Sequence, residues 1–337
     1  MKITYLIPIF LLGFGMHAQT GINELLAAGI DDAKQFSDDY FSPAAEGVMY
    51  ALSNAWYNSA KSKKPGHVEL SIIGNASFVN DEDKSFTLNV ADYNYLRFMD
   101  PAQQSGEVAT ALGENDPDIT MIIEYENELG ITEEVEIELP QGIGSTGINL
   151  LPTAYLQLGV GVFKGTEVKV RYLPKIDQGD VEVQLYGGAL QHELTSWIPG
   201  AGNLPIAIGV LVGYTHFEAG FNLEDNSVVE GDNQKIESEV NSLMVSALVS
   251  TKLPVINFYA GLGYLSGNAQ SDLLGTYHIQ TGVLGGTTIK DPYSIENKVS
   301  GVKATLGTKL KLGFFRLHAD YSFQRFSNAS VGISFGF

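Results

Sequence analysis

The sequence predicts an all-β fold: a transmembrane antiparallel β-barrel of 12–14 strands with a small N-terminal helical hatch. Three observations predict it. The first is an apolar N-terminal run typical of exported proteins. The second is a long series of segments in which apolar and polar residues alternate, as in strands that have one face on lipid. The third is a final segment that ends on Phe337, with an apolar residue at every second position before it.

Composition excludes several classes of function. The 337 residues include 20 Lys and Arg against 39 Asp and Glu, which gives a formal net charge of −19. A surface this acidic repels nucleic acid, because affinity there depends on Lys and Arg neutralising phosphates. The chain has no cysteine, which excludes a disulfide scaffold, a thiol nucleophile and a thiolate-bound metal. The 37 glycines and 10 % aromatic residues favour a large all-β structure.

The first residues have the pattern of a secretory signal peptide. Lys2 supplies a positive start, the run from Ile3 to Met16 is uncharged, and Ala18 is a small residue before the predicted cleavage at Gln19. No later uncharged apolar run approaches the ~18 residues that a spanning helix needs. The sequence therefore predicts a signal peptide over residues 1–18 and export without a helical anchor, either as a soluble protein or as a β-barrel.

Residues 19–64 are expected to form the helical hatch. From Ile22 to Phe36, apolar residues recur every three to four positions, as on one face of a helix. Ser42-Pro43 predicts the start of a second helix, since Ser is a common N-cap and Pro suits the first helical position. The pattern ends at the hatch junction, formed by Trp56, Tyr57 and Asn58. The apolar stripe indicates a hatch inside the lumen or, alternatively, a periplasmic appendage that binds a partner.

Residues 65–337 are expected to form the barrel, because the dominant period there is two. In the clearest case, Phe315 to Arg325, apolar residues alternate with polar ones over a length that matches the ~9–11 residues of a tilted spanning strand. Two weaker candidates are Glu133–Leu139 and Leu273–Thr281. Bacterial barrels have even strand counts, so 12 or 14 strands are expected. The twelve better candidates start near Val68, Ser85, Ile119, Asn149, Thr166, Asp180, Pro205, Glu239, Val255, Lys298, Phe314 and Asn328.

The last strand carries a specific signal. Val331, Ile333, Phe335 and Phe337 lie on one face, with small residues between them. This pattern resembles the assembly signal of bacterial outer-membrane barrels, which the barrel insertion machinery recognises. Because lipid offers no hydrogen-bond partners, a spanning sheet must also close on itself. The partners implied are that machinery, outer-membrane lipid and lipopolysaccharide.

Loop lengths predict the two ends of the barrel. If Phe337 lies at the periplasmic side, Leu312-Gly313 and the Lys252–Pro254 corner are short periplasmic turns. The long segments 222–235 and 266–297 then face outward, and residues 100–148 form a long outer loop or hairpin. Aromatic residues near strand ends suit the interfacial girdles: Trp197, Phe163, Tyr264, Phe314 and Phe337.

Polar residues on the inward faces of the predicted strands form a candidate site. As a lumen ladder of salt bridges and hydrogen bonds they hold one another, because buried charges need partners. The catalytic alternative, a barrel hydrolase, makes His318 a general base oriented by Asp320, but no nucleophile is placed by the sequence. The ladder is favoured, and it comprises Glu69, Glu167, Lys169, Arg171, Lys309, Lys311, Arg316, His318, Asp320 and Gln324.

Metal and cofactor sites are not predicted. His192-Glu193 and His216-Phe217-Glu218 contain residue types that bind metals, but neither belongs to a spaced set of ligands. We therefore expect no metal, no cofactor and no enzymatic activity.

Two short motifs carry a family resemblance. The order of signal peptide, helical segment, Ser53 to Ala60 and barrel resembles the long-chain fatty-acid transporter type of outer-membrane barrel, with Asn58-Ser59-Ala60 in the place of that family's Asn-Pro-Ala turn. The run from Tyr40 to Lys61, with Gly165 to Pro174, resembles an uncharacterised Bacteroidota outer-membrane barrel family. The resemblance implies a plugged barrel that passes hydrophobic solutes.

The expected protein is therefore a barrel in the outer membrane of a Gram-negative bacterium. Its expected role is passive transport of a small solute, with a hydrophobic solute as one option, through a lumen that the hatch closes. The alternative is a structural or surface-interaction barrel that does not transport and acts through its acidic extracellular loops.

Overall fold

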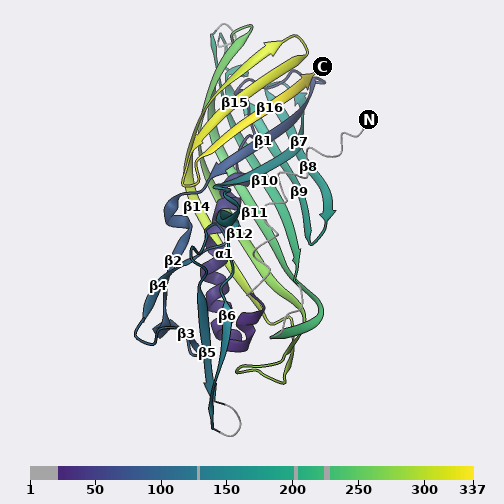
Figure 1. Ribbon diagram of the computed structural model, residues 1–337. Helices are drawn as coiled ribbons and strands as arrows, with labels where there is room; N and C mark the ends of the chain where they lie inside the picture. The colour runs from purple at the N-terminus through teal and green to yellow at the C-terminus, as the bar shows by residue number, and fades with distance from the viewer. Residues whose placement is uncertain (1–21, 127–129, 201–203, 224–227) are drawn as a thin grey trace.

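The computed structural model describes residues 22–126, 130–200, 204–223 and 228–337. The predicted signal peptide and its cleavage position, Ala18 and Gln19, lie outside these residues. Within them, no helix combines the length and the apolar character needed to cross a membrane. The described chain consists of a β-barrel, a helix that enters it, and an appendage of small sheets at one end (Figure 1).

Ten antiparallel strands form the closed barrel, which confirms the predicted transmembrane β-barrel. β1 pairs with β16 and, across a long insertion, with β7, so the ring of strands closes on itself. The short β13 (Thr288–Lys290) pairs with β12 outside the ring. The barrel strands are β1 (Val68–Phe78), β7 (Leu150–Phe163), β8 (Thr166–Gln178), β9 (Val181–Glu193), β10 (Ile206–Asn222), β11 (Val229–Thr251), β12 (Ile256–Ile279), β14 (Tyr293–Leu312), β15 (Phe315–Phe323) and β16 (Asn328–Gly336).

The expected count of 12 or 14 barrel strands is wrong, because four of the candidate segments are not separate strands of the barrel. The candidates near Ser85 and Ile119 are β2 (Ser85–Asn89) and β5 (Thr120–Glu126), and Glu133–Leu139 is β6 (Thr132–Glu138); all three lie in the appendage. Leu273–Thr281 overlaps the far end of β12. Alternation identifies a strand, but the sheet that it joins depends on its pairing partners.

Outward-facing residues define a lipid band around the barrel. On β12, the residues from Ile256 to Tyr264 expose apolar side chains at alternate positions over about the ~9–11 residues that a tilted strand needs. Exposed aromatic residues encircle the barrel at both edges of this band, and these two belts are called the aromatic rings. One lies near Phe337 and includes the predicted Phe163, Trp197 and Phe314. The opposite one consists of Phe78, Tyr172, Tyr186, Tyr214, Tyr264, Tyr321 and Phe323. Beyond that second ring, β11, β12 and β14 expose mainly polar residues.

The two rims of the barrel differ in the length of their connections. The rim at Phe337, called the C-terminal rim, carries the β7–β8 and β14–β15 turns, in which Gly165 and Gly313 adopt the positive φ (77° and 66°) that tight hairpins require. The opposite rim, called the appendage rim, carries residues 79–149 and 280–292. Residues 100–148 lie within the long connection at the appendage rim, but the predicted loops 222–235 and 266–297 are mostly strand, because β11, β12 and β14 extend far towards that rim.

The appendage consists of two small sheets between β1 and β7. One pairs β2 with β4 (Ser105–Ala109), and the other has the order β3 (Leu96–Phe98), β5, β6. Short 3-10 turns accompany them at Asp81–Asp83, Val90–Asp92 and Ile143–Thr146, and another, Leu194–Ser196, follows β9. The buried Asp32 of the helix accepts hydrogen bonds from the backbone of Asn94 (2.9 Å) and Tyr95 (2.8 Å), which ties the appendage to the helix.

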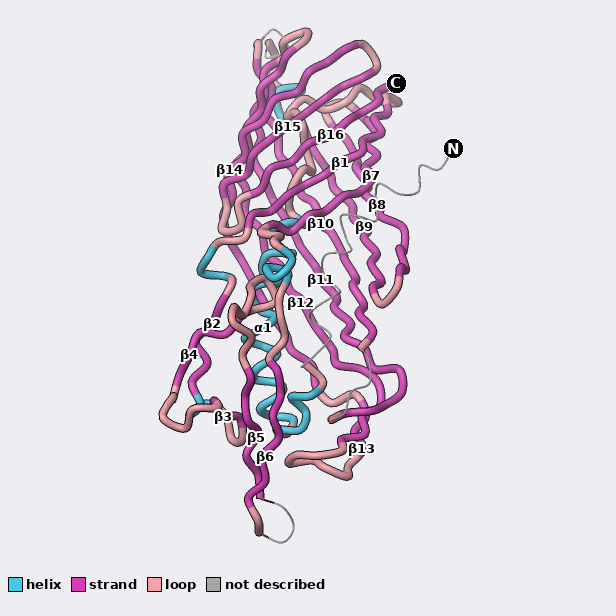
Figure 2. Tube along the Cα trace, in the orientation of Figure 1, coloured by secondary structure: helices cyan, strands magenta, loops and turns pink. Residues whose placement is uncertain are grey.

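One long helix, α1 (Ile30–Leu52), stands where two helices were predicted; a short 3-10 turn, η3 (Glu24–Ala28), precedes it. Pro43 lies inside α1, although proline removes one helical hydrogen bond. Both halves are buried: Phe36 and Tyr40 pack against the appendage, and Met49 and Leu52 pack against the barrel wall. This packing keeps the helix continuous through Pro43. Figure 2 shows α1 passing from the appendage to the inside of the strands.

Candidate functional site: the plugged lumen and its apolar chamber

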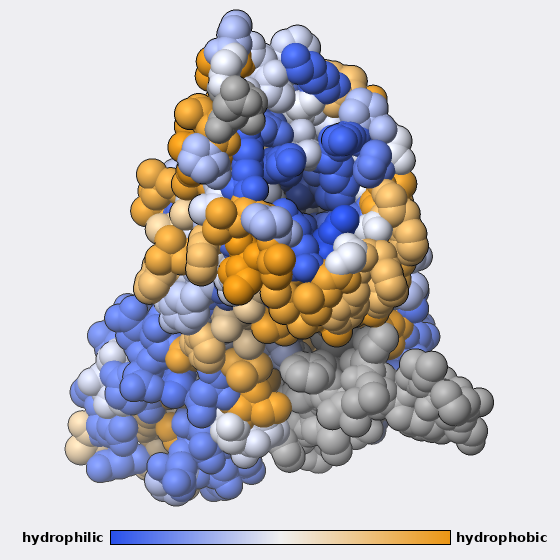
Figure 3. All heavy atoms as spheres, turned by 90° about the horizontal axis from the view of Figure 1, so that it is seen from above, coloured by the Kyte–Doolittle hydropathy of each residue, from blue (hydrophilic) through white to orange (hydrophobic). Residues whose placement is uncertain are grey.

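Residues 53–64, called the plug segment, fill the half of the lumen next to the C-terminal rim. The chain leaves α1 at Leu52, and Ser53 to Asn58 are all buried inside the barrel. The end of α1 and the plug segment therefore lie inside the barrel, whereas the first half of α1 packs against the appendage. Seen from the C-terminal rim, hydrophilic residues line a hollow at the mouth, and hydrophobic residues surround it (Figure 3).

Glu69 of β1 is the centre of one charged cluster. Its carboxylate lies 3.1 Å from the Lys309 ammonium and 3.6 Å from that of Lys63, and it pairs with Arg316. Asn58 of the plug segment donates to Glu69 (3.1 Å) and accepts from Lys309 (2.7 Å). Both Glu69 and Lys309 are buried, so each depends on these partners for the solvation that water no longer gives.

Glu167 of β8 is the centre of a second cluster. It pairs with Lys63 of the plug segment and with Lys169 of its own strand at 3.3 Å. Farther around the rim, the carboxylate of Glu193 accepts from the backbone of Ser62 at 3.1 Å. The ladder therefore does more than pair its own members, because three barrel carboxylates hold the plug segment directly.

Two buried cations hold the end of α1. Arg171 donates to the carbonyls of Leu52 (2.9 Å) and Asn54 (3.0 Å), and Lys303 donates to the carbonyl of Ser53 (3.1 Å). The last carbonyls of a helix have no partners within it and carry its negative dipole end, so cations are favourable there. The Arg171 guanidinium also stacks on Trp56, at 3.4 Å from the ring centroid. Lys303 is a plug contact that the predicted ladder omitted.

Wall glycines receive the large side chains of α1 and the plug segment. Trp56 lies against Gly213, Tyr57 against Gly261, and Tyr50 of α1 against Gly301. A methyl group on any of these glycines would overlap the side chain facing it. The absence of a side chain at these wall positions therefore makes room for the plug segment and α1.

The remaining ladder residues divide between lumen and rim. His318 and Asp320 are buried in the wall, but neither ring nitrogen of His318 has a hydrogen-bond partner among the described residues, and Asp320 accepts from Tyr259 at 2.8 Å. The oriented pair of the catalytic alternative is therefore not formed. Lys311 lies half-buried beside the C-terminal rim, and Gln324 lies in the turn after β15, outside the ladder where it was predicted.

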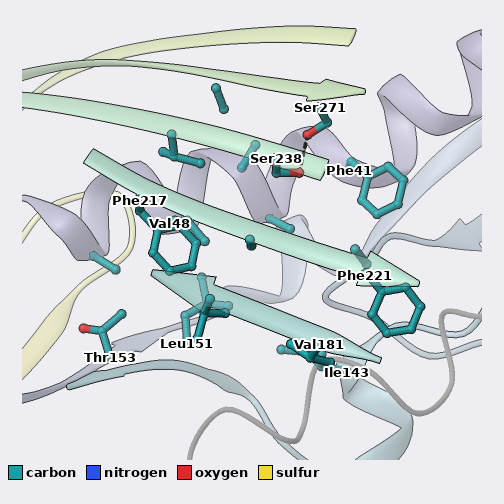
Figure 4. Close-up of a pocket in the computed structure, with 18 of the residues that line it drawn as sticks. Phe41, Val48, Ile143, Leu151, Thr153, Val181, Phe217, Phe221, Ser238 and Ser271 are labelled. Carbon is teal, nitrogen blue, oxygen red and sulfur yellow. Dashed lines mark hydrogen bonds between the residues drawn. The ribbon is translucent and has the colours of Figure 1, made fainter. Parts of the chain in front are cut away.

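The other half of the lumen is an apolar chamber. A cavity of about 220 Å³ lies between α1 and the wall formed by β7 to β12. Figure 4 shows Phe217 and Phe221 of β10 lining it together with Val48 and Phe41 of α1. Its further apolar lining includes Ala45, Leu151, Leu173, Val183, Leu185, Ala219, Ile236, Val240 and Ala269.

The wall of the chamber is not continuously hydrogen-bonded. β7 and β8 pair from Phe163–Thr166 only as far as Leu156–Tyr172, although both strands continue. Pro152 and Pro174 lie just beyond that point, and proline cannot donate to a β-ladder. The parts of the two strands that do not pair, residues 150–155 of β7 and 173–178 of β8, are called the β7–β8 seam. Residues from both strands along this seam line the chamber.

Sequence reasoning missed the chamber. Its signal is visible in β9, where Val181, Val183 and Leu185 share the inward face although a lumen face was expected to be polar. Alternation alone does not show which face is inward, because apolar Tyr186 and Leu190 occupy the other face of the same strand.

The histidine and acidic pairs noted in the sequence do not join a larger set of possible metal ligands among the described residues. Within residues 22–126, 130–200, 204–223 and 228–337, no group of three or more His, Asp or Glu side chains could hold a metal ion. His216 instead bonds Asn241 (2.8 Å) and Glu218 (2.9 Å).

The fold resembles that of Gram-negative outer-membrane proteins. The chain belongs to a family of unknown function, DUF6588, whose model matches residues 1–337. No curated protein matches the sequence. Its likeness to fatty-acid transporter barrels and its Bacteroidota origin stay predictions.

Several solved barrels resemble this fold. The attachment invasion locus protein Ail of Yersinia pestis is 8 % identical with a TM-score of 0.27, over 81 % of this chain and 99 % of that one. The translocator domain of autotransporter NalP from Neisseria meningitidis is 9 % identical with a TM-score of 0.27, over 92 % and 99 %. The transport unit of autotransporter AIDA-I from Escherichia coli is 8 % identical with a TM-score of 0.30, over 88 % and 97 %. Likeness at this level carries no argument about function.

Proposed function

We propose that this barrel passively transports a small apolar solute, which it binds in the chamber. The observation that supports the proposal is the chamber itself: about 220 Å³ lined almost entirely by hydrocarbon, inside a barrel whose other half is packed with charges. An apolar cavity of this kind stays dry and binds apolar molecules, since water finds too few partners there.

The proposed orientation places the C-terminal rim in the periplasm, because short turns of such barrels are periplasmic and long connections are extracellular. The chamber then lies near the outer aromatic ring, since Leu173 and Leu185 are next to Tyr172 and Tyr186 along their strands. The β7–β8 seam becomes the entrance for a solute from the outer surface. Lipid and lipopolysaccharide around the aromatic rings, and the insertion machinery at the last strand, belong to this proposal.

Transit to the periplasm requires a rearrangement of the plug segment. As described, Glu69, Glu167 and Arg171 hold it closed, and its aromatic side chains occupy the wall glycines. In this proposal the plug contacts described above define the closed state. The proposal includes no covalent step and no enzymatic activity.

Uptake by intact cells tests the proposal. The probe is 1-aminonaphthalene, a neutral fluorescent bicyclic amine, and the variant Ala219→Phe fills the chamber from β10. We expect cells that produce the protein to take up the probe several times faster than cells without it, and Ala219→Phe to remove the gain. Ala247→Phe, which faces outward on β11, is the matched control and should behave as the parent. Equal uptake with and without the protein would refute transport.

The runner-up function, a surface-interaction barrel, is favoured by one observation. On the outer face of the β5–β6 hairpin, Glu124 and Glu134 lie directly opposite each other, and Glu136 and Glu138 share that face. Like charges in opposite positions destabilise a sheet, so a stability argument does not account for them. Binding of a cationic partner that is lost when these glutamates become glutamines, with uptake unaffected, would support this second function.

A further inference from the structure

We infer that the chamber selects neutral, compact hydrophobic solutes and rejects carboxylates such as fatty-acid anions. This inference rests on the proposed function, since it takes the chamber as the ligand site. It concerns the chemical class of the ligand, which the lining residues determine through their size, their hydrogen bonds and their charge.

The volume sets the size of the ligand. An apolar cavity of about 150 Å³ holds one benzene molecule, so a cavity of about 220 Å³ has room for a two-ring hydrocarbon or a chain of roughly eight to ten carbons. A longer acyl chain would extend beyond the cavity. Phe217, Phe221 and Phe41 supply flat apolar surfaces on opposite sides of the space, which suits a ring or a folded short chain (Figure 4).

The polar side chains in the lining already have partners. Ser238 and Ser271 bond each other at 2.7 Å across β11 and β12, as Figure 4 shows. Thr153 accepts from Asn75 (3.0 Å), and Thr146 donates to the carbonyl of Ile143 (2.7 Å). The Gln141 amide donates to Asn115 and Asp118, and its oxygen accepts from the backbone of Asn115. Thr153 and one of the two serines keep an O–H that can bond a ligand hydroxyl, but these neutral groups supply no positive charge to a ligand carboxylate.

The lining also provides no countercharge. None of the described residues that line the chamber is a lysine, arginine or histidine. The nearest buried cations, Arg171 and Lys303, are occupied by carbonyls at the end of α1. Next to the β7–β8 seam, Lys175 is neutralised by Glu182 at 2.7 Å. Burying an ionised carboxylate without a partner is strongly unfavourable, so a fatty-acid anion of the right length is excluded while its alcohol is accepted.

Equilibrium binding to the purified protein in lipid nanodiscs tests this inference. Bound 1-aminonaphthalene is displaced by 1-decanol or by decanoate at pH 8, and the signal from Ala219→Phe is subtracted to remove partition into lipid. We expect decanol to compete at a concentration at least ten times lower than decanoate. Decanoate that competes as well as decanol would overturn the inference and leave the proposed function standing. Absence of a specific probe signal would overturn both.

A designed change of specificity provides the second arm. Val183→Arg places a cation in the chamber wall on β9, and it should improve competition by decanoate at least ten-fold while weakening that by decanol. Folding of the variant is checked by the heat-dependent mobility that closed barrels show on gels. An arginine here that leaves the decanoate affinity unchanged would show that charge does not decide the selection. The comparison of decanol with decanoate in the parent protein does not depend on the folding of Val183→Arg.

Discussion

The two halves of the lumen are held together by different kinds of contact. Next to the C-terminal rim, buried charges such as Glu69, Lys309 and Arg171 hold the plug segment through directional bonds of fixed length. Next to the appendage, α1 and the wall meet through hydrocarbon, and a cavity of about 220 Å³ remains. Each buried charge needs a partner within bonding distance, so the positions of the charged side chains and of the plug segment are closely fixed. Apolar contact is non-directional, so it tolerates a space that a ligand can fill.

The comparison also explains how one continuous segment serves both halves. The final turns of α1 present Val48 and Leu52 to the chamber, and the next residues present backbone carbonyls and Asn58 to the charges. The change occurs at Leu52, where the helix ends and its free carbonyls need donors. The boundary between the two halves is therefore the end of the helix.

The largest expected effect comes from Glu69→Gln, which removes the countercharge shared by Lys309, Arg316 and Lys63. Leaving buried cations unpaired costs about 3–5 kcal/mol. We expect a lower unfolding temperature and, in planar bilayers, a steady conductance where the parent is closed. Glu296→Gln, which breaks the exposed pair with Lys298, is the control and should change neither. A closed and fully stable Glu69→Gln protein would mean that the charges do not hold the plug.

The wall glycines should come next. Gly213→Ala places a methyl group 2.9 Å from the Trp56 ring, which has no free space to move into, and overpacking of this kind costs about 1–3 kcal/mol. We expect the substitution to lower the unfolding temperature. Because Trp56 is buried and Trp197 exposed, it should also change the fluorescence of the buried tryptophan.

The matched control for the glycine test is Gly188→Ala. A methyl group there meets only the Lys169 carbonyl, at 3.9 Å, so the substitution should be neutral. Equal behaviour of the two variants would show that the plug is loosely seated and that the polar half is less closely packed than described.

On the apolar side, the prolines of the β7–β8 seam should control how fast a solute exchanges. The double change Pro152→Val and Pro174→Val restores backbone donors and allows the ladder to continue past Leu156–Tyr172. We expect release of 1-aminonaphthalene, followed by stopped-flow fluorescence, to slow several-fold with little change in affinity. Pro254→Val, at the C-terminal rim, should leave the rate unchanged. Unchanged release from the double variant would place the entrance elsewhere.

The smallest effect is expected at Glu24 of η3, which lies beside the appendage and outside the membrane. Burial, with added repulsion from Glu138, raises the pKa of Glu24 above 4.5. The folded protein then binds this proton more tightly than the unfolded chain, so the stability from the group is present below pH 4.5 and is lost as the pH rises through the raised pKa. Glu24→Gln should therefore raise the unfolding temperature slightly at pH 7 but not at pH 4.

Glu107 provides a contrast of opposite sign. Hydrogen bonds from Thr87 and Ser85 lower the pKa of Glu107, so its contribution to stability is present at neutral pH. Glu107→Gln should lower the unfolding temperature at pH 7. The same response of both variants to pH would show that the protonation argument is wrong.

The sequence by itself determined the closed spanning sheet and much of its inward polar face. Phe315 to Phe323 alternates so regularly that its outward side is apolar and its inward side contains His318 and Asp320, as found. Period-two patterning is a local property, because neighbouring side chains of a strand point to opposite faces whatever the strand pairs with. The rim that carries the short turns could also be predicted from the sequence, because it depends only on the lengths of the connections between strands.

Only the tertiary structure decided which strands close the ring, that α1 continues through Pro43, and where the chamber lies. β2, β5 and β6 alternate like barrel strands, yet they join the two small sheets of the appendage, β2 with β4 and β5 with β3 and β6. Leu173, Val183 and Phe217 are ordinary apolar residues in their own strands, and they form a chamber only because the ring brings them together opposite α1. Pairing partners and enclosed volume are relations between distant segments, which no pattern within one segment contains.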